Sequence, residues 1–324
     1  MRCGAPIARP GTQLHGIEAP STLPAMQLPS PLTPGARVAL VAPAGPLGSA
    51  AELERALEHA RSFGWDPVVG EHALARHGYL AGTDEERARD LNASLANDSI
   101  DGIWCLRGGY GALRLLPAID VDALRRHPKA IIGFSDITAL HAALGQAAQL
   151  VTFHGPTARG ALSDFSRDSL ARAVVHRRDP CGDAPGARIL RSGRADGRLV
   201  GGNLAILASL AGTPYAPDYV DAILVVEDVG EPTYRIDRML RQLELSGALG
   251  RLAGIVFGHF TEGTEPGDTT SRELDDVLRE SAEVAGVPAI AGAPIGHIAD
   301  QWTIPLGTRA ELDADRRTLR VAIA

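Results

Sequence analysis

The chain has 324 residues, which is long enough for two domains that each bury a full core. Its formal net charge of −7 at pH 7 comes without any basic run, which argues against nucleic acid or an anionic membrane surface as the main partner. A small-molecule substrate or a protein partner suits this charge better.

The three cysteines, Cys3, Cys105 and Cys181, lie far apart and form no Cys-x-x-Cys motif, which argues against a disulfide framework and a zinc knuckle. No stretch reaches the roughly 18 apolar residues that a membrane span needs. Prolines occupy the N-terminal region in which a signal peptide would carry its apolar segment. We therefore expect a cytoplasmic protein without a membrane partner.

Lysine chemistry has almost no candidates, because the only lysine of the chain is Lys129 and every other basic residue is arginine. A Walker P-loop, a pyridoxal Schiff base and a Ser-x-x-Lys hydrolase each need a lysine at a defined place. None of these patterns is present.

The N-terminal residues 1–35 are rich in proline and show no sustained hydrophobic period. They are predicted to form a disordered leader, or to include a mis-assigned start if Met26 rather than Met1 is the initiator. From Arg37 onwards, apolar strand-like runs alternate with amphipathic helical segments. The expected elements are strands near 37–43, 67–69, 103–106, 129–133 and 149–156, and helices near 50–64, 83–97 (with a capping box at 83–86), 112–116 and 137–144.

Residues 177–194 are rich in arginine, aspartate, proline and glycine, which predicts a linker. The expected elements beyond it are strands near 197–201, 222–227, 252–258, 312 and 319, a turn at 201–203, and helices after 203, over 234–245 and from about 271. Apolar strands separated by helices predict a parallel sheet covered on both faces. The predicted fold class is therefore α/β. An N-terminal parallel-sheet domain at 36–176, flavodoxin- or amidotransferase-like, is followed by a smaller α/β domain at 195–324.

The residues Gly133, Phe134, Ser135 and Asp136 lie where a predicted strand breaks and an apolar helix begins. Serine and aspartate both favour helix N-caps, so a capping role is one interpretation. A sharp strand-to-helix turn at the edge of a parallel sheet also exposes a side chain beside the free N–H groups of the helix, which suits a nucleophile. Ile137 stands where a Gly-x-Ser-x-Gly elbow has its second glycine, so both interpretations stay open.

The glycine-rich segment 107–111 (RGGYG) follows the preceding strand. Arg114 stands where a G-x-G-x-x-G dinucleotide motif has its last glycine, which argues against a bound cofactor. Paired glycines at a strand end can present a bare N–H group to an oxyanion, or they can form only a tight turn.

Glu227 ends the apolar strand 222–226, where a carboxylate needs a partner to offset the cost of its desolvation. A salt bridge to the nearby Arg235 or Arg238 would meet that need without any catalytic role. Both possibilities remain.

The ten histidines show no His-x-x-x-His on an obvious helix, so no metal site is predicted. His154, His259 and His297 each follow a strand or lie in a loop, and any of them could act as a base. The residues alone do not choose among the three. Cys105 sits among apolar neighbours inside a strand and is expected to be a core residue.

Five segments occur in an order that resembles the L,D-carboxypeptidase family of serine peptidases, which includes the microcin C self-immunity hydrolases. The segments are RGGYG (107–111), GFSD (133–136), GGNL (201–204), VEDVGEPTYRIDRML (226–240) and PIGHIADQWTIPLG (294–307). Each is short, but together they cover both predicted domains, from about residue 36 to 324.

The resemblance implies a catalytic triad of Ser135 as nucleophile, Glu227 as orienting carboxylate and His297 as general base. It also implies that the backbone N–H groups of Gly109 and Asp136 stabilise the oxyanion. Because Ser135 and the Glu227–His297 pair come from different predicted domains, we expect the site in the cleft between them.

In the same segments, Gly108 and Tyr110 are expected to contact the substrate. The resemblance further implies a cytoplasmic homodimer without cofactor or metal, which removes the terminal D-alanine from a murein tetrapeptide. Two alternatives are cleavage of aminoacyl-nucleotide amides, as in the immunity branch, and a non-catalytic α/β ligand-binding protein.

Overall fold

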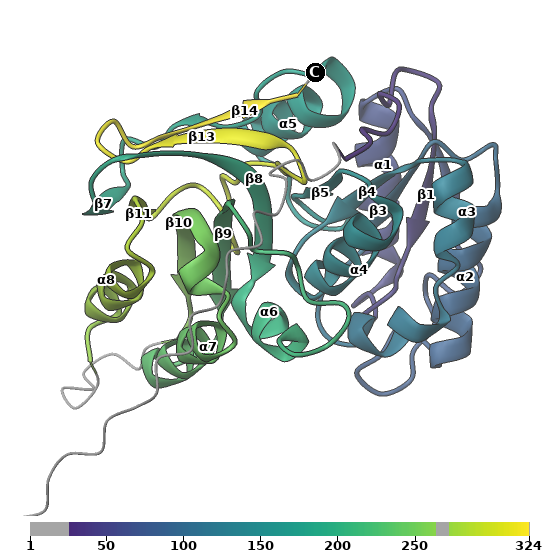
Figure 1. Ribbon diagram of the computed structural model, residues 1–324. Helices are drawn as coiled ribbons and strands as arrows, with labels where there is room; N and C mark the ends of the chain where they lie inside the picture. Colours follow the sequence, from purple (N-terminus) through teal and green to yellow (C-terminus); the bar gives the residue numbers. More distant parts are fainter. Residues whose placement is uncertain (1–25, 264–271, 324) are drawn as a thin grey trace, which may run out of the picture.

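The computed structural model of the protein describes residues 26–263 and 272–323 (Figure 1). Two α/β halves lie side by side, each built on its own sheet (Figure 1). Among the described residues, no helix is long and apolar enough to cross a membrane.

The N-terminal sheet has six strands in the order β12-β5-β4-β3-β1-β2. The first five strands in chain order run parallel, as predicted, whereas β12 pairs antiparallel with β5 at the edge. The strands are β1 Arg37–Val41, β2 Asp66–Val69, β3 Gly102–Cys105, β4 Ala130–Gly133, β5 Thr152–His154 and β12 Ile304–Leu306. Since β12 comes from the predicted C-terminal domain, the chain crosses between the halves more than once.

Helices cover both faces of this sheet. Apolar residues of α1 and α5 pack on one face, and those of α2, α3 and α4 pack on the other. The helices are α1 Ala50–Ser62, α2 Asp84–Ala96, α3 Val121–Arg126, α4 Thr138–Ala148 and α5 Asp164–Ala171. The predicted capping box is confirmed at α2, where Thr83 and Glu86 each bind the other's backbone N–H group.

The C-terminal sheet has eight strands in the order β6-β14-β13-β8-β9-β10-β11-β7. Its central strands β8, β9, β10 and β11 run parallel, and the outer strands pair antiparallel. Helices α6 Leu204–Leu210, α7 Thr233–Leu245 and α8 Leu274–Ala285 pack on one face. The strands are β6 Gly182–Asp183, β7 Arg188–Arg191, β8 Arg194–Asn203, β9 Ala222–Val229, β10 Leu252–Thr261, β11 Ala289–Ala291, β13 Arg309–Asp313 and β14 Thr318–Ala322.

Two predicted irregular segments are wrong where the structure describes them. The predicted linker 177–194 contains β6 and β7, which form the two edges of the C-terminal sheet; its polar composition suits edge strands that face solvent. The predicted leader is packed from residue 26, because Gln27 pairs with Leu150 and Leu32 is fully buried in the core. Residues 1–25 lie outside the described residues.

Candidate active site

The backbone at Ser135 turns sharply between β4 and α4. Ser135 has a φ of 64°, in the left-handed region that a residue with a side chain adopts at a cost of about 1–3 kcal/mol. A short 3-10 turn over Ser135–Ile137 then leads into α4 at Thr138. Such strain at the carboxyl end of a parallel strand is the geometry of a nucleophile elbow.

The capping interpretation of Ser135 is wrong. The N-cap position of the 3-10 turn is Phe134, and the N-cap position of α4 is Ile137. Neither element has a side-chain hydrogen bond at its N-cap. The Ser135 hydroxyl forms no hydrogen bond with any described residue, and its side chain is only partly buried. It is therefore free to react or to bind a ligand.

The glycine-rich segment 107–111 packs directly against this junction. A Cβ atom at Gly108 would lie 2.8 Å from Ser135 Cβ and 3.0 Å from Ser135 Oγ, so glycine is needed for the close approach. Gly109 follows with a φ of +104°, a left-handed backbone conformation that residues with a side chain rarely adopt. The Gly45 N–H donates to the Gly108 carbonyl at 2.9 Å and holds the segment in place.

The side chain of Asp136 ties the junction to the glycine-rich segment. Its Oδ2 atom accepts a hydrogen bond from the Ala112 N–H at 2.8 Å. Burial raises the pKa of the Asp136 carboxyl to about 6, although hydrogen bonds from Ala112 and Gly111 and the charge of Arg87 oppose that rise. The role predicted for Asp136 from the sequence concerns its backbone N–H group. The hydrogen bond of its side chain to the glycine-rich segment depends on tertiary contact and was not predicted.

Glu227 and His297 form a hydrogen-bonded pair in the C-terminal half. The distance from His297 Nδ1 to Glu227 Oε2 is 2.8 Å, and the Glu227 side chain is fully buried near the end of β9. Gly296 brings the two segments together, because a Cβ atom there would lie 3.1 Å from the Glu227 side chain. The alternative salt bridge is wrong, since Glu227 pairs with His297. Arg235 pairs with Glu231, and Arg238 lies over the Tyr234 ring.

The pairing of His297 determines which ring nitrogen is free. A carboxylate only accepts hydrogen bonds, so Nδ1 carries a proton and Nε2 is left as the acceptor when the ring is neutral. The His297 side chain is 23% exposed, and its ring centroid lies 4.7 Å from that of Phe134, the neighbour of Ser135. The pair therefore lies beside the Ser135 junction with its basic nitrogen available.

The other two candidate histidines are not placed in this way. His154 is fully buried in β5, neither ring nitrogen has a hydrogen-bond partner among the described residues, and burial lowers its pKa well below the ordinary value. Burial also lowers the pKa of His259. Neither forms a hydrogen bond or ion pair with a described carboxylate. Of the three candidates, His297 is the one that contacts a described carboxylate.

Asn203 joins Glu227 to Asp228 and Thr138 through hydrogen bonds, and no role for Asn203, Asp228 or Thr138 is predicted from the sequence. The Asn203 amide donates to Asp228 Oδ1 at 2.8 Å and, more weakly, to Glu227 Oε1 at 3.4 Å. The Asn203 N–H donates to Thr138 Oγ1 at 2.9 Å, which joins β8 to the start of α4. The segment 201–204, which is part of the family resemblance, is the sequence signal that could have indicated a role for Asn203. The turn predicted at 201–203 is wrong, because these residues are the end of β8.

A hollow of about 500 Å³ opens beside the glycine-rich segment, lined by Gly45, Tyr79, Arg107, Gly109 and Tyr110. The Tyr79 and Tyr110 rings meet edge to face with centroids 5.6 Å apart, and both are exposed.

Within the described part of the chain, no group of three or more His, Cys, Asp or Glu side chains is arranged to hold a metal ion. Cys105 is a core residue as predicted, and burial raises the pKa of its thiol to about 12.

The fold and this site define a hydrolase of two α/β halves, with a strained serine in one half and a carboxylate–imidazole pair in the other. Two family models match the chain: the LD-carboxypeptidase N-terminal domain over residues 38–155 and the LD-carboxypeptidase C-terminal domain over residues 196–312. The chain therefore belongs to the LD-carboxypeptidase family.

Individual relatives agree with this assignment. The murein tetrapeptide carboxypeptidase of Pseudomonas aeruginosa is 38% identical, over 86% of this chain and 94% of that protein. The crystal structure of muramoyltetrapeptide carboxypeptidase from Oxalobacter formigenes is 32% identical with a TM-score of 0.78, and the match covers 88% of this chain and 97% of that one. The microcin C7 self-immunity protein of Escherichia coli is 27% identical, over 82% of this chain and 87% of that protein.

Proposed function

We propose that this protein is a serine L,D-carboxypeptidase that removes the C-terminal D-alanine of a murein tetrapeptide. The observation that carries the proposal is the buried Glu227–His297 hydrogen bond of 2.8 Å beside the strained Ser135 junction. Relatives named for murein tetrapeptide and muramoyltetrapeptide carboxypeptidase, at 38% and 32% identity, support this substrate.

In the proposed reaction, His297 Nε2 removes the Ser135 proton, and Ser135 Oγ attacks the carbonyl carbon of the penultimate residue. The backbone N–H groups of Gly109 and Asp136 stabilise the oxyanion of the tetrahedral intermediate. His297 then protonates the amine as the C–N bond breaks, which releases D-alanine and leaves an acyl ester on Ser135. Water attacks that ester by the same steps and regenerates the free enzyme.

Each residue of the triad has one task in this scheme. Glu227 keeps the proton on His297 Nδ1 and stabilises the imidazolium that forms during the attack. In the structure, Ser135 Oγ and His297 are not yet hydrogen-bonded; catalytic hydrogen bonds are often long in a free enzyme and tighten when substrate binds. Gly108, which packs against Ser135, contacts the substrate in this scheme, and Tyr110 with its neighbour Tyr79 forms a wall for the peptide.

The enzyme is further proposed to work in the cytoplasm as a homodimer, with no cofactor, metal, nucleic acid or membrane partner. These parts of the proposal follow from the family resemblance and from the composition of the chain. A chelator such as EDTA should leave activity unchanged, since no step of the scheme uses a metal.

The decisive experiment is incubation of the purified protein with a murein tetrapeptide, followed by mass detection of free D-alanine and the tripeptide. A parallel reaction offers an aminoacyl sulfamoyl adenosine, and the Ser135→Ala protein serves as a blank for both. Cleavage of the nucleotide compound alone would assign the protein to the immunity branch, and cleavage of neither would favour the non-catalytic alternative.

A further inference from the structure

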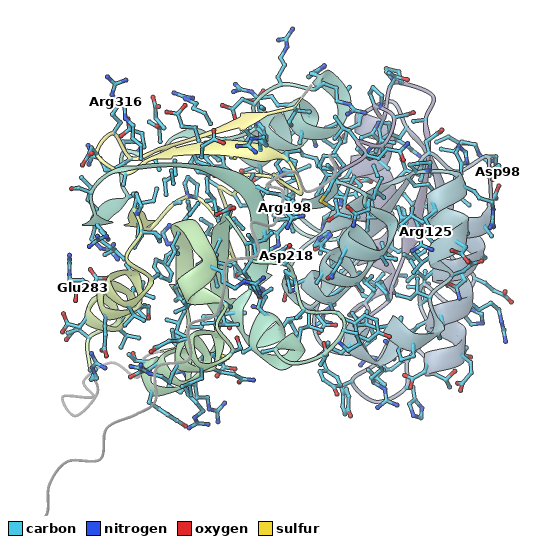
Figure 2. All side chains as sticks on the ribbon, viewed as in Figure 1. Asp98, Arg125, Arg198, Asp218, Glu283 and Arg316 are labelled. Atoms are coloured by element: carbon cyan, nitrogen blue, oxygen red, sulfur yellow. The ribbon has the colours of Figure 1, made fainter. Side chains whose placement is uncertain are left out.

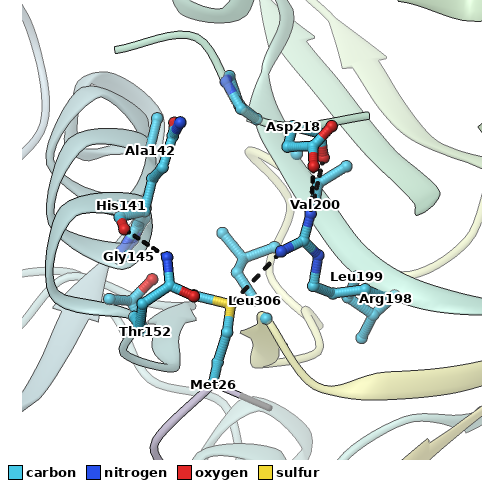
Figure 3. A pocket seen from close by; sticks show the side chains of 15 residues that line it. Met26, His141, Ala142, Gly145, Thr152, Arg198, Leu199, Val200, Asp218 and Leu306 are labelled. Atoms are coloured by element: carbon cyan, nitrogen blue, oxygen red, sulfur yellow. Dashed lines mark hydrogen bonds and ion pairs between the residues drawn. The ribbon is translucent and has the colours of Figure 1, made fainter. Parts of the chain in front are cut away.

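A second cavity of about 240 Å³ lies between α4 and β8, where the two halves meet (Figure 3). None of its lining residues belongs to the proposed catalytic group. The N-terminal half, with strand β12 of its sheet, contributes Met26, His141, Ala142, Gly145, Gln146, Gln149, Thr152, Leu306 and Gly307, and the C-terminal half contributes Arg198, Leu199, Val200, Gly201, Pro217 and Asp218.

Arg198 gives the cavity a positive charge that is only partly neutralised. Its Nη2 atom donates to the Asp218 carbonyl at 3.0 Å and lies 3.6 Å from Asp218 Oδ2. Asp218 also pairs with Arg251 at 3.6 Å, so one carboxylate serves two guanidinium groups. In the view of Figure 2, Arg198 and Asp218 lie near the middle of the molecule, whereas Asp98, Glu283 and Arg316 lie at its edges.

Two guanidinium nitrogens of Arg198 lack a strong partner among the described residues: the buried Nε has none, and Nη1 has only a weak one. The only hydrogen-bond contact of Arg198 Nη1 with a described residue is the Met26 sulfur at 4.0 Å (Figure 3). A thioether is a weak acceptor, whereas a carboxylate oxygen at this place would form a charge-assisted hydrogen bond. The side chain is 18% exposed, so the surrounding protein shields the interaction from water.

Two buried polar groups on the opposite wall also lack partners among the described residues: the Thr152 hydroxyl and His141 Nδ1. His141 Nε2 bonds to the Gly133 carbonyl at 2.8 Å and therefore carries the proton, which leaves Nδ1 as an acceptor. Burial lowers the pKa of His141 to about 4 and keeps the ring neutral. Buried polar groups without partners are rare, so a bound molecule or water that reaches this wall is favoured.

The rest of the lining is largely apolar, including Ala142, Val200, Pro217 and Leu306. At about 30 Å³ per water molecule, the volume corresponds to roughly eight non-hydrogen atoms. The part of a ligand that this cavity holds is therefore small, with an apolar body and one anionic end.

We propose that this cavity binds a small amphipathic carboxylate, with its carboxylate on Arg198 and its apolar body against Val200 and Leu306. The ligand contacts both halves of the protein and therefore stabilises their present arrangement. His141 links the cavity wall to Gly133, two residues before Ser135, which places the ligand one hydrogen bond away from the strand that carries the junction.

The probe is 4-methylpentanoate, which has a branched apolar body and eight non-hydrogen atoms, and its neutral amide is the matched control compound. Calorimetry and thermal unfolding are measured on the Ser135→Ala protein, so that turnover plays no part. We expect saturable binding of the carboxylate, a rise in melting temperature, and at least tenfold weaker binding of the amide.

Three variants test the location. Arg198→Gln should weaken binding at least tenfold, and Thr152→Val, which preserves shape, should weaken it about threefold. Arg251→Gln is the matched control. It also removes a guanidinium group that pairs with Asp218, but Arg251 does not line the cavity, so binding should change less than threefold. Absence of saturable binding, equal binding of the amide, or binding retained in both Arg198→Gln and Thr152→Val would overturn the proposal. It stands or falls independently of the proposed peptidase activity.

Discussion

The Ser135 junction and the Glu227 strand end occupy the same kind of position, the carboxyl end of a parallel strand, but they are built by different physics. Ser135 depends on backbone geometry: a left-handed φ of 64° and glycine neighbours that leave space. Glu227 depends on electrostatics: it is a fully buried carboxylate whose partner His297 comes from a loop 70 residues away. Strain that exposes a reactive group is local, whereas stabilising a buried charge needs distant parts of the chain.

The largest effect is expected on the Ser135 side of this comparison. Ser135→Ala should lower kcat by roughly 10⁴- to 10⁶-fold, because the attacking group is lost, while the protein stays folded. Steady-state kinetics on the murein tetrapeptide and thermal unfolding measure both. The exposed Ser192→Ala is the control and should be silent. Activity within tenfold of wild type in a folded Ser135→Ala protein would refute the nucleophile assignment.

The histidine substitutions test whether pairing with Glu227 identifies the base. His297→Ala should reduce turnover about 10⁴-fold or more, since no other described histidine contacts a buried carboxylate at this site. His154→Ala and His259→Ala should each retain at least part of the activity, measured as kcat on the same substrate. An inactive but folded His154→Ala protein beside an active His297→Ala protein would show that the wrong imidazole has been chosen.

Glu227→Gln separates charge from shape. The amide preserves the volume but cannot stabilise the imidazolium and can favour the wrong tautomer, so kcat should fall about 10³- to 10⁴-fold with KM much less affected. Glu231→Gln is the matched control: it pairs with Arg235 at the surface, where an ion pair contributes under about 1 kcal/mol, and kcat should change less than tenfold. If the two variants exchange these results, the triad needs a different carboxylate.

The smallest expected effect concerns stability at the junction. Because burial raises the Asp136 pKa to about 6 from the ordinary 3.8, the folded protein binds more protons than the unfolded chain between these values. The contribution of Asp136 to the free energy of unfolding therefore falls as pH rises from about 4 to 6, by up to about 3 kcal/mol.

Asp136→Asn removes that titration while keeping an acceptor for the Ala112 N–H. Urea unfolding at pH 4 and pH 7 should show wild type losing stability relative to the variant over this interval. Parallel pH profiles for the two proteins would mean that the Asp136 carboxyl is solvated and that the junction is less closed than the structure indicates.

Local features were predictable from sequence because short segments encode them. The capping box at Thr83 and Glu86 and the alternation of apolar strands and helices appear as predicted. The two edge strands β6 and β7 were missed, since their arginine- and glycine-rich residues also suit a loop and only sheet pairing distinguishes the two. Leu32 was likewise assigned to a disordered leader, and its burial depends on residues far along the chain.

The sequence by itself determined the α/β class, the strand-to-helix break at Ser135 and a short set of candidate acids and bases, because hydrophobic period and turn chemistry act over a few residues. The residue pattern left three histidines open and the family resemblance implied His297; the tertiary structure then shows that His297, rather than His154 or His259, contacts Glu227. Only the tertiary structure shows that the side chain of Asp136 anchors the glycine-rich segment. The physical reason is that a buried charge or unpaired polar group is tolerated only where distant segments supply its partner, and that pairing is made by the packing of the whole chain.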